Sequence, residues 1–225
     1  MFTLHNGDCH KFDVPAFDVV ITDPPYPDYH AEEYEYFDGL LEFLNKYNCR
    51  QIIFWSAKVE FPLSYSAIHI WDKRNGAGSM YERIFERNGG NAYKVYRKYF
   101  INSSYAALRT RDEWTEHPSQ KPIQLLRVLI EEHTKVGDVV FDPFMGSGTT
   151  GVAAMQMGRR FIGCENNTKW FSVAEKRISS AVLSPSFYTP SNTACSGRLA
   201  TSAQSELFVT DDKSPSKARG ATRRR

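Results

Sequence analysis

The chain has 225 residues, of which 41% are hydrophobic and 14% aromatic, and its formal net charge is +2. This length and apolar content suit one folded domain with a sizeable core and exclude a chain that is disordered throughout. The apolar runs are of strand length, well short of the ~20 residues of a membrane-spanning helix. The first residues, MFTLHNGD, lack the basic and apolar stretches of a secretion signal, so we expect a cytoplasmic protein that does not enter a membrane.

Apolar strands alternate with helical patterns along the chain. We expect strands at residues 18–22, 51–55, 67–71, 139–141 and 160–164. Helical spacing of apolar residues predicts helices within residues 34–47, directly after Pro122, at about 149–157 and at about 168–181. Such alternation implies a mainly parallel sheet covered on both faces, so the predicted fold class is α/β.

The composition changes after residue 182, where Ser, Thr, Pro, Ala and charged residues replace the large apolar side chains. Such a composition does not support a packed core. We therefore divide the chain into a folded domain, residues 1–182, and a disordered C-terminal segment, residues 183–225. The segment is basic, with seven basic residues against three acids.

A second basic region lies inside the folded domain. Between residues 83 and 111 the chain carries seven basic residues against one acid, Glu86. Contact with a phosphate backbone requires a local excess of this kind, although an ordinary solvated face has the same composition. The basic residues are Arg83, Arg87, Lys94, Arg97, Lys98, Arg109 and Arg111.

The cysteines are few and widely spaced. Cys9, Cys49, Cys164 and Cys195 form no CxxC pair. This spacing favours reduced thiols over a zinc site or a disulfide framework, and we expect no bound metal.

The first motif that carries chemistry is DVVITDPPY, residues 18–26. A buried strand delivers Asp23, Pro24, Pro25 and Tyr26 to its carboxyl end, the edge at which α/β sheets bind ligands. Such a turn suits methylation of the exocyclic amine of adenine or cytosine. That amine is a poor nucleophile because its lone pair is delocalised into the ring. Two acceptors, the Asp23 carboxylate and the Pro24 carbonyl, would hold its N–H bonds and free that lone pair, while Tyr26 suits stacking on a base taken out of the duplex. The structural alternative is a proline-rich turn with an incidental tyrosine.

The second motif is VVFDPFMGSGTT, residues 139–150. A buried strand ends at Asp142, and Gly146 and Gly148 let the following turn pass close to a ligand at a helix N-terminus. The turn lacks the spacing of dinucleotide binders and the lysine of a phosphate-binding loop. Glu165, at the end of the next strand, suits hydrogen bonds to two ribose hydroxyls. Together these features indicate an adenosine-type cofactor without a required pyrophosphate.

The two motifs together resemble those of amino-methylating DNA methyltransferases of the N6-adenine and N4-cytosine type. DPPY precedes the glycine turn, an order similar to that of the beta group of these enzymes. Further pieces resemble the same family over about residues 3–182. They are LHNGD (residues 4–8), HIWDK (69–73), YERIFE (81–86), HPSQKP (117–122) and AEKRI (174–178).

The resemblance implies roles for single residues. Asp23, Pro24 and Tyr26 would be catalytic, and Pro25 would shape the loop. Residues that would hold the methyl donor, S-adenosylmethionine, are Asp142, Phe144, Gly146, Ser147, Gly148, Thr149 and Glu165. Asp8 would meet the adenine side of the donor, and Ser119 and Lys121 would lie near its methionine end. The alternatives are that Asp8 caps a turn and that Lys121 is a solvated lysine at a helix start.

The resemblance also implies a Rossmann-like fold, with a mainly parallel seven-stranded sheet, one reversed strand and helices on both faces. In the beta group the target-recognition segment precedes the HPSQKP element. Here it covers about residues 85–116 and contains most of the basic region, interleaved with tyrosines. Because larger members have long recognition inserts, this short segment predicts a brief or degenerate target site.

The expected activity is site-specific methylation of N6 of adenine in double-stranded DNA, within a bacterial or phage-infected cell. N4-cytosine methylation is the first alternative, although Asp at the first motif position favours adenine. RNA or protein-amide methylation is the second, against which the motif order argues. A catalytically inactive DNA-binding scaffold is the third. The sequence leaves open a restriction-modification or an orphan role, and a monomer or a dimer.

The C-terminal segment contains QSELF, residues 204–208. This is similar to the QxxLF-type peptide by which bacterial DNA-processing proteins dock on the replication sliding clamp. Leu207 and Phe208 are large apolar residues in a polar segment, suited to a hydrophobic pocket, and Gln204 suits a hydrogen bond at its rim. The alternative is general attraction to DNA through the basic end of the segment, RRR at residues 223–225.

Overall fold

The computed structural model describes residues 1–27, 39–73, 80–97 and 115–183. All of these lie within one compact unit, Met1–Thr189. The strands are β1 (Phe2–Asn6), β2 (Val19–Thr22), β3 (Arg50–Trp55), β4 (Ala67–Asp72), β5 (Tyr81–Arg87), β6 (Val95–Arg97), β7 (Val139–Asp142) and β8 (Arg160–Glu165). The helices are the 3-10 turn η1 (Cys9–Lys11) and α1 (Leu40–Asn45), α2 (Ile123–His133), α3 (Thr149–Gln156) and α4 (Thr168–Leu183).

The strands form one mostly parallel sheet in the order β1-β8-β7-β2-β3-β5-β4-β6. Every neighbouring pair is parallel except the two that involve β5, which runs opposite to β3 and β4. The predicted α/β class and the single reversed strand are confirmed. The predicted number of seven strands is wrong, because the three residues of β6 add an eighth strand beside β4.

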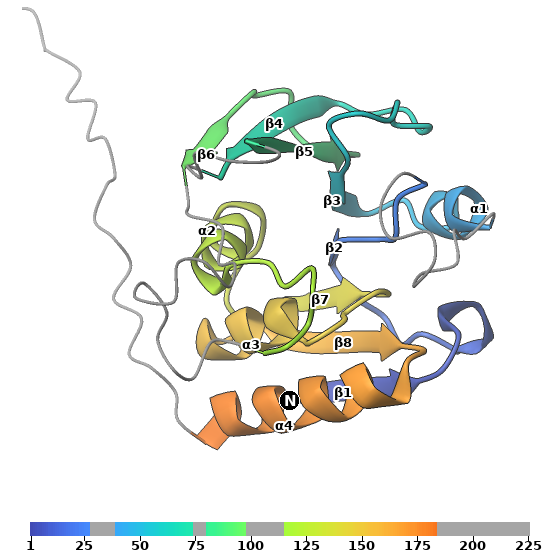
Figure 1. The fold of residues 1–225 in the computed structure, drawn as a ribbon, viewed down its shortest axis with the longest axis vertical. Coiled ribbons are helices and arrows are strands. Elements are labelled where there is room, and N and C mark those ends of the chain that lie inside the picture. Colours follow the sequence, from blue (N-terminus) through green and yellow to red (C-terminus); the bar gives the residue numbers. More distant parts are fainter. Residues whose placement is uncertain (28–38, 74–79, 98–114, 184–225) are drawn as a thin grey trace, which may run out of the picture. The chain divides into compact units, whose positions relative to one another are not determined.

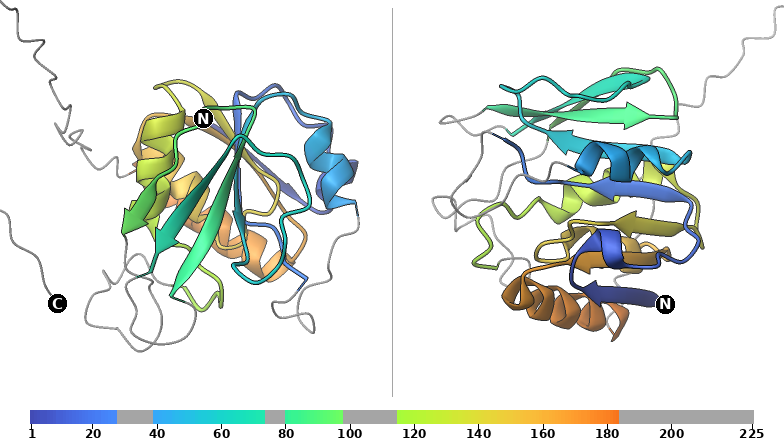
Figure 2. Two further views of the ribbon diagram at one scale, coloured as in Figure 1. Left: turned by 90° about the horizontal axis from the view of Figure 1, so that it is seen from above. Right: turned by 90° about the vertical axis from the view of Figure 1, so that its right-hand side faces the viewer.

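Helices cover both faces of the sheet, as predicted (Figures 1 and 2). One core cluster joins side chains of α2, α3 and α4 to one face, and a second joins η1 and α1 to the other. Alternating residues of each central strand enter the two clusters, so that Ile52 and Phe54 of β3 face α2 whereas Ile53 and Trp55 face α1. The central strands are thus buried on both sides, which explains their continuous apolar runs.

Most predicted elements are found within one or two residues of their expected bounds. The helical pattern at residues 34–47 gives only α1, and residues 28–38 lie outside the described part. Strands β1, β5 and β6 were not predicted as strands. The predicted recognition segment begins inside β5, so its first residues, Phe85 to Arg87, belong to the sheet. Residues 98–114 of that segment, and the C-terminal segment beyond Leu183, lie outside the described residues.

Parallel β2, β7 and β8 end at one edge of the sheet, which we call the carboxyl edge. The DPPY turn follows β2, the glycine turn follows β7, and Glu165 ends β8. Because β5 is reversed, its first residues also lie at this edge and its last residues lie at the opposite one. No helix in the described ranges is long and apolar enough to cross a bilayer.

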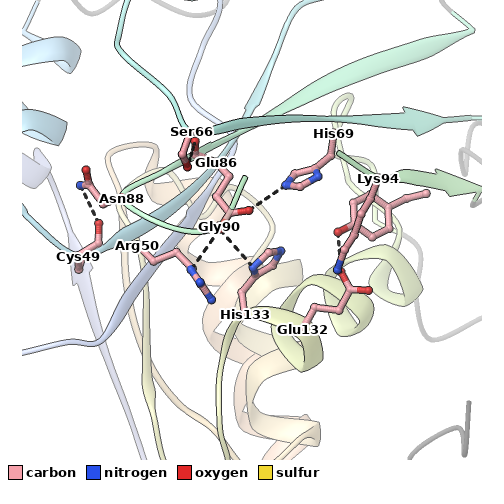
Figure 3. Close-up of polar contacts among 11 residues, drawn as sticks. Cys49, Arg50, Ser66, His69, Glu86, Asn88, Gly90, Lys94, Glu132 and His133 are labelled. Carbon is pink, nitrogen blue, oxygen red and sulfur yellow. Dashed lines mark hydrogen bonds and ion pairs between the residues drawn. The ribbon is translucent and has the colours of Figure 1, made fainter. Parts of the chain in front are cut away.

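A buried polar cluster ties β3, β4, β5 and α2 together at the opposite edge (Figure 3). Glu86 of β5 accepts hydrogen bonds from His69 Nε2 at 3.1 Å and from the Gly90 amide at 2.8 Å, and it pairs with Arg50 at 3.2 Å. His133, at the end of α2, lies 3.9 Å from the same carboxylate. Burial lowers the pKa of His69, and it lowers that of His133 to about 4, so both imidazoles are neutral at pH 7.

We predict that Glu86→Ala lowers the free energy of unfolding by about 3 kcal/mol, because removing one partner of a buried pair leaves the others unsatisfied. Urea unfolding followed by circular dichroism measures this loss. The matched control is Glu175→Ala on the exposed side of α4, expected to change stability by less than about 0.5 kcal/mol. Equal midpoints for the two variants would contradict the structural role of Glu86.

Candidate active site

A cavity of about 740 Å³ lies at the carboxyl edge. Its walls combine the residues after β1, the DPPY turn, the HPSQKP element, the glycine turn and the end of β8. Stretches more than 100 residues apart in the sequence therefore face one space. All predicted catalytic and cofactor-binding residues line it except Gly148. They are Asp8, Asp23, Pro24, Pro25, Tyr26, Ser119, Lys121, Asp142, Phe144, Gly146, Ser147, Thr149 and Glu165.

The DPPY turn fixes one oxygen of its own aspartate. The Tyr26 hydroxyl donates a hydrogen bond to Asp23 Oδ1. The Tyr26 ring is buried and packs edge-on against Trp55, with ring centroids 5.5 Å apart. Two consecutive prolines restrict the backbone between these side chains. The carboxylate is thus oriented before any ligand enters.

The second oxygen of Asp23 binds Lys121. Lys121 Nζ forms an ion pair with Asp23 Oδ2 and lies 3.3 Å from Glu82 Oε2. Glu82 Oε1 in turn pairs with Lys73 Nζ at 2.6 Å. The alternative that Lys121 is a solvated lysine is wrong, because its side chain is 9% exposed. The predicted place near the methionine end of a donor stays a prediction, whereas the direct contact to Asp23 is new.

Burial and neighbouring charges compete over these groups. Burial raises the pKa of Asp23, and the Lys121 ammonium offsets part of that rise. For Lys121 burial acts against the charged form, but Asp23 and Glu82 outweigh it and raise the pKa. Burial alone would raise the pKa of Glu82, yet Lys121 and Lys73 lower it. The ionised form of Asp23 therefore depends on the ammonium group beside it.

The glycine turn is shaped by contacts on both of its sides. Gly146 has φ +51° and donates its amide to Glu165 Oε2 at 2.9 Å. Gly148 has φ +78° and begins α3. A Cβ at Gly148 would lie 2.8 Å from the Ala174 Cβ of α4. This glycine therefore allows α3 and α4 to approach, which is a different role from the predicted close approach to a ligand.

Asp142 is buried where β7 meets β2. Its Oδ1 accepts hydrogen bonds from Thr22 Oγ1 at 2.8 Å and from the Phe144 amide at 3.1 Å. Burial raises the pKa of Asp142 to about 7, which these hydrogen bonds and that of Thr150 oppose. Asp142 thus joins the two strands that carry the two motifs and shapes the glycine turn.

The Glu165 carboxylate bridges the end of β8 and the glycine turn. Besides the Gly146 amide, it accepts the Asn167 amide on Oε1 at 2.8 Å. Burial raises its pKa, and the two amides oppose the rise. The acid sits at the cavity wall, where a ligand with paired hydroxyls would meet its remaining acceptor positions.

Asp8, which follows β1, and Ser119, in the HPSQKP element, line the same cavity. Asp8 caps η1, because its carboxylate accepts the His10 amide at 3.0 Å, and this hydrogen bond lowers its pKa. The alternative of a turn cap is therefore confirmed, although Asp8 also lines the cavity. Ser119 Oγ is buried and has no hydrogen-bond partner among the described residues. A buried hydroxyl without a partner is a position at which a ligand would be bound.

Sequence reasoning missed two residues that hold this region in place. Arg177 of α4 donates to the Ser147 carbonyl at 2.5 Å and lies 3.3 Å from Thr149 Oγ1, which fixes the glycine turn from behind. His117 accepts the Ser119 amide on Nδ1, and burial lowers its pKa to about 4. Both lie in stretches named for their resemblance, AEKRI and HPSQKP, which alone gave no role to either side chain.

Lys73 and Glu82 were also missed. Their signal was weak, because Lys73 in HIWDK and Glu82 in YERIFE lie in stretches that only resembled the family and carried no assigned role. Their meeting depends on the reversed direction of β5, which brings Glu82 beside the residue that follows β4. Because β5 was not predicted from the sequence, the contact between Lys73 and Glu82 could not be predicted either.

The described residues of the basic region fall into two groups, those whose side chains are bound within the protein and those whose side chains are exposed. Arg87 is buried, and its guanidinium donates to the Ser64 carbonyl at 2.9 Å, Gln51 Oε1 at 2.8 Å and Asn45 Oδ1 at 2.6 Å. The prediction that Arg87 contacts DNA is therefore wrong, because its donors are used inside the protein.

Arg83 is likewise engaged by the chain, because it donates to the Ser56 and Val59 carbonyls. It belongs to the packing of the β3–β4 connection rather than to a free basic surface. Lys94 and Arg97 are more exposed, with side chains 41% and 64% accessible, and pair with acids on the surface. Lys98, Arg109 and Arg111 lie outside the described residues.

A family model described as DNA methylase matches residues 49–176, more than half of the chain. The chain therefore belongs to the DNA methylase family, and the resemblance inferred from DPPY and the glycine turn is confirmed. It is 34% identical over 130 residues to the type II methyltransferase M2.DpnII of Streptococcus pneumoniae, an alignment that covers 48% of each chain. It is 44% identical over 70 residues to the DNA adenine methyltransferase YhdJ of Escherichia coli, covering 31% of this chain and 24% of that one. The chain thus spans half or less of the length of these curated relatives.

Solved structures share the fold. The M1.HpyAVI complex with S-adenosylmethionine superposes with a TM-score of 0.55 at 24% identity, over 79% of this chain and 99% of that one. The N4-cytosine-specific PvuII DNA methyltransferase superposes with a TM-score of 0.54 at 14% identity, over 81% and 93% of the two chains. At these identities the likeness establishes the α/β methyltransferase fold and leaves the substrate to be argued from the site.

We predict that Gly148→Ala destabilises the protein more than Gly158→Ala does. Both glycines have left-handed backbones, with φ +78° and +74°, so each substitution costs about 1 kcal/mol of strain. A Cβ at Gly158 meets only an ordinary contact at 3.5 Å, whereas one at Gly148 overlaps Ala174, which adds about 1–3 kcal/mol. Thermal and urea unfolding measure both losses, and equal losses would show that α3 and α4 do not need this close approach.

Proposed function

We propose that this protein transfers the methyl group of S-adenosylmethionine to N6 of adenine in double-stranded DNA. The observation that carries the proposal is the shared cavity, where the oriented Asp23 carboxylate faces the same space as the glycine turn and Glu165. The base would leave the duplex to reach this cavity, because an amine inside a stacked pair is not accessible to Asp23.

The cavity walls fit the methyl donor. Glu165 would accept hydrogen bonds from the ribose hydroxyls, and the amides at the start of α3 suit a polar ligand at a helix N-terminus. Ser119 Oγ, which is buried and has no partner in the part of the chain that the structure describes, offers a hydroxyl for the methionine portion. Asp8 and Phe144 would border the adenine, and Asp142 would hold the turn in shape. M1.HpyAVI, whose structure is a complex with S-adenosylmethionine, shares the fold, which supports S-adenosylmethionine as the donor.

The chemistry needs an amine with an available lone pair. When bound, S-adenosylmethionine supplies an electrophilic methyl group on a sulfonium sulfur. Asp23 accepts one N–H of the target amine and the Pro24 carbonyl accepts the other, so the nitrogen lone pair points away from both acceptors. As the nitrogen bonds the methyl carbon, the carbon–sulfur bond breaks and a neutral thioether leaves. The nitrogen then releases one proton, which the Asp23 carboxylate that holds the amine would accept. Tyr26 lines the cavity and is the aromatic side chain of the turn that we assign to contact with the base.

Adenine is the preferred base for two reasons. Asp occupies the first position of the DPPY motif, which in this family is more frequent in adenine enzymes. The relative YhdJ is named a DNA adenine methyltransferase. The likeness to the N4-cytosine enzyme PvuII rests on 14% identity and supports the fold alone. Arg97 is the described residue that we assign to DNA phosphates, because its guanidinium is exposed and it lies level with Asp72, the last residue of β4. Lys94 instead pairs with Glu132 near the end of α2, at the opposite edge.

We predict that incubation with labelled S-adenosylmethionine and unmethylated duplex DNA yields N6-methyladenine, detected by nucleoside mass spectrometry. Asp23→Ala should abolish turnover while donor binding, measured by calorimetry, survives. N4-methylcytosine as the product would change the base assignment and keep the mechanism. Loss of donor binding in Asp23→Ala would show that Asp23 serves the donor, and absence of any product from the unaltered protein would favour the inactive scaffold.

We further propose that QSELF in the C-terminal segment docks on a bacterial sliding clamp, which would concentrate the enzyme on newly replicated DNA. This segment lies outside the described residues, so the proposal rests on its sequence. A peptide covering residues 201–212 should bind purified clamp, and a peptide with Leu207→Ala and Phe208→Ala should not. Equal binding of the two peptides, or none by either, would contradict it.

A further inference from the structure

Four charged side chains, two buried and two partly buried, form one chain of contacts at the cavity wall. Asp23, Lys121, Glu82 and Lys73 alternate in sign and sum to zero charge. Their side chains are 22%, 9%, 13% and 9% exposed. The contacts link the turn after β2, the element before α2, the start of β5 and the residue after β4. Four separate elements therefore converge on the carboxylate assigned to catalysis.

The reaction itself uses only the first member. Asp23 Oδ1 faces Tyr26, and the target amine must share or replace that hydroxyl contact. Asp23 Oδ2 stays with Lys121, which is too deeply buried to leave for solvent. Glu82 reaches Asp23 both by its own charge and through the shared Lys121, and Lys73 reaches it through its ion pair with Glu82.

We propose that Glu82 and Lys73 are positioning residues for Asp23, which set the balance of charge around the catalytic carboxylate and around the Lys121 that pairs with it. This inference rests on the proposed function and extends it to two residues that were assigned no role from the sequence. A single lysine beside Asp23 would neutralise it. The Glu82 carboxylate shares the Lys121 ammonium with Asp23. The Lys73 ammonium in turn pairs with Glu82 and offsets its negative charge.

Other ionisable groups face the cluster and stay the same in the variants considered below. From its own turn Asp23 meets Tyr26, from β7 it meets the Asp142 charge, and from the HPSQKP element His117 senses Lys121. Burial holds His117 neutral at pH 7, whereas Asp142, whose pKa burial raises to about 7, is partly ionised at that pH. Both groups are unchanged in every variant, so differences between the variants report the charges of Lys121, Glu82 and Lys73.

Opposite responses to two neighbouring substitutions follow from this arrangement. Lys73→Met leaves two carboxylates to share Lys121, so the pKa of Asp23 rises and activity disappears at a higher pH than in the unaltered protein. Glu82→Gln removes the competing carboxylate, so the pKa of Asp23 falls and activity extends to lower pH. Each shift should be roughly one pH unit. The double variant has the charge balance of an isolated Asp23–Lys121 pair and should return towards the unaltered position.

The test measures kcat/KM for methyl transfer against pH in the unaltered protein, both single variants and the double variant. The matched control is Lys135→Met, the same substitution at an exposed position after α2, which should leave the acid limb in place. A second readout needs no turnover. The carboxyl carbon of Asp23, labelled with carbon-13 and assigned by its loss in Asp23→Asn, is titrated by nuclear magnetic resonance in each variant.

Shifts of opposite sign in both readouts, with partial reversal in the double variant, would support the proposal. Shifts of the same sign, or no shift of the Asp23 resonance in folded variants, would overturn it, since a merely structural role lowers activity at every pH alike. If the unaltered protein methylates no base, the proposed function fails, and the carbon resonance still decides whether Glu82 and Lys73 control Asp23.

Discussion

A buried hydrogen bond between Thr22 and Asp142 joins residues 120 positions apart in the sequence. Thr22 is the last residue of β2 and Asp142 the last of β7, and the two strands pair directly in parallel register. Both side chains are removed from solvent, so the bond forms in surroundings where an unpaired hydroxyl or carboxyl would be costly. It fixes the relative height at which the two strands end. The turn that carries Asp23 and the turn that begins α3 consequently open into one cavity.

The fold followed from the sequence wherever burial produced a clear pattern. Strands β2, β3 and β7 are buried on both faces and gave continuous apolar runs, and α2 showed apolar residues at helical spacing. Strand β1 was missed because its five residues, FTLHN, have no such run and alternate only partly. Strand β6 is three residues long and owes its existence to pairing with β4, a contact between distant residues that local patterns do not encode.

The site residues that could be predicted from the sequence are those that end or follow a parallel strand. Asp23, Asp142 and Glu165 each end or follow such a strand, so the topology alone brings them to one edge. Lys73 and Glu82 meet only because β5 is reversed. Arg87 was wrongly predicted to contact DNA, because a count of charges along the chain does not show where a side chain points. Its guanidinium is enclosed among Asn45, Gln51 and Ser64 and does not face solvent.

The reversed strand has a consequence for how the chain folds. Parallel neighbours such as β2 and β7 are separated by more than 100 residues, and closing such distances costs conformational entropy before any contact forms. Among the strand pairs that the structure describes, β4 and β5 have the shortest connection, residues 73–80. This hairpin is therefore the pair that we expect to form first, and the long-range parallel pairs would then assemble around it. The antiparallel pair of β4 and β5 would then be the folding nucleus of an otherwise mostly parallel sheet.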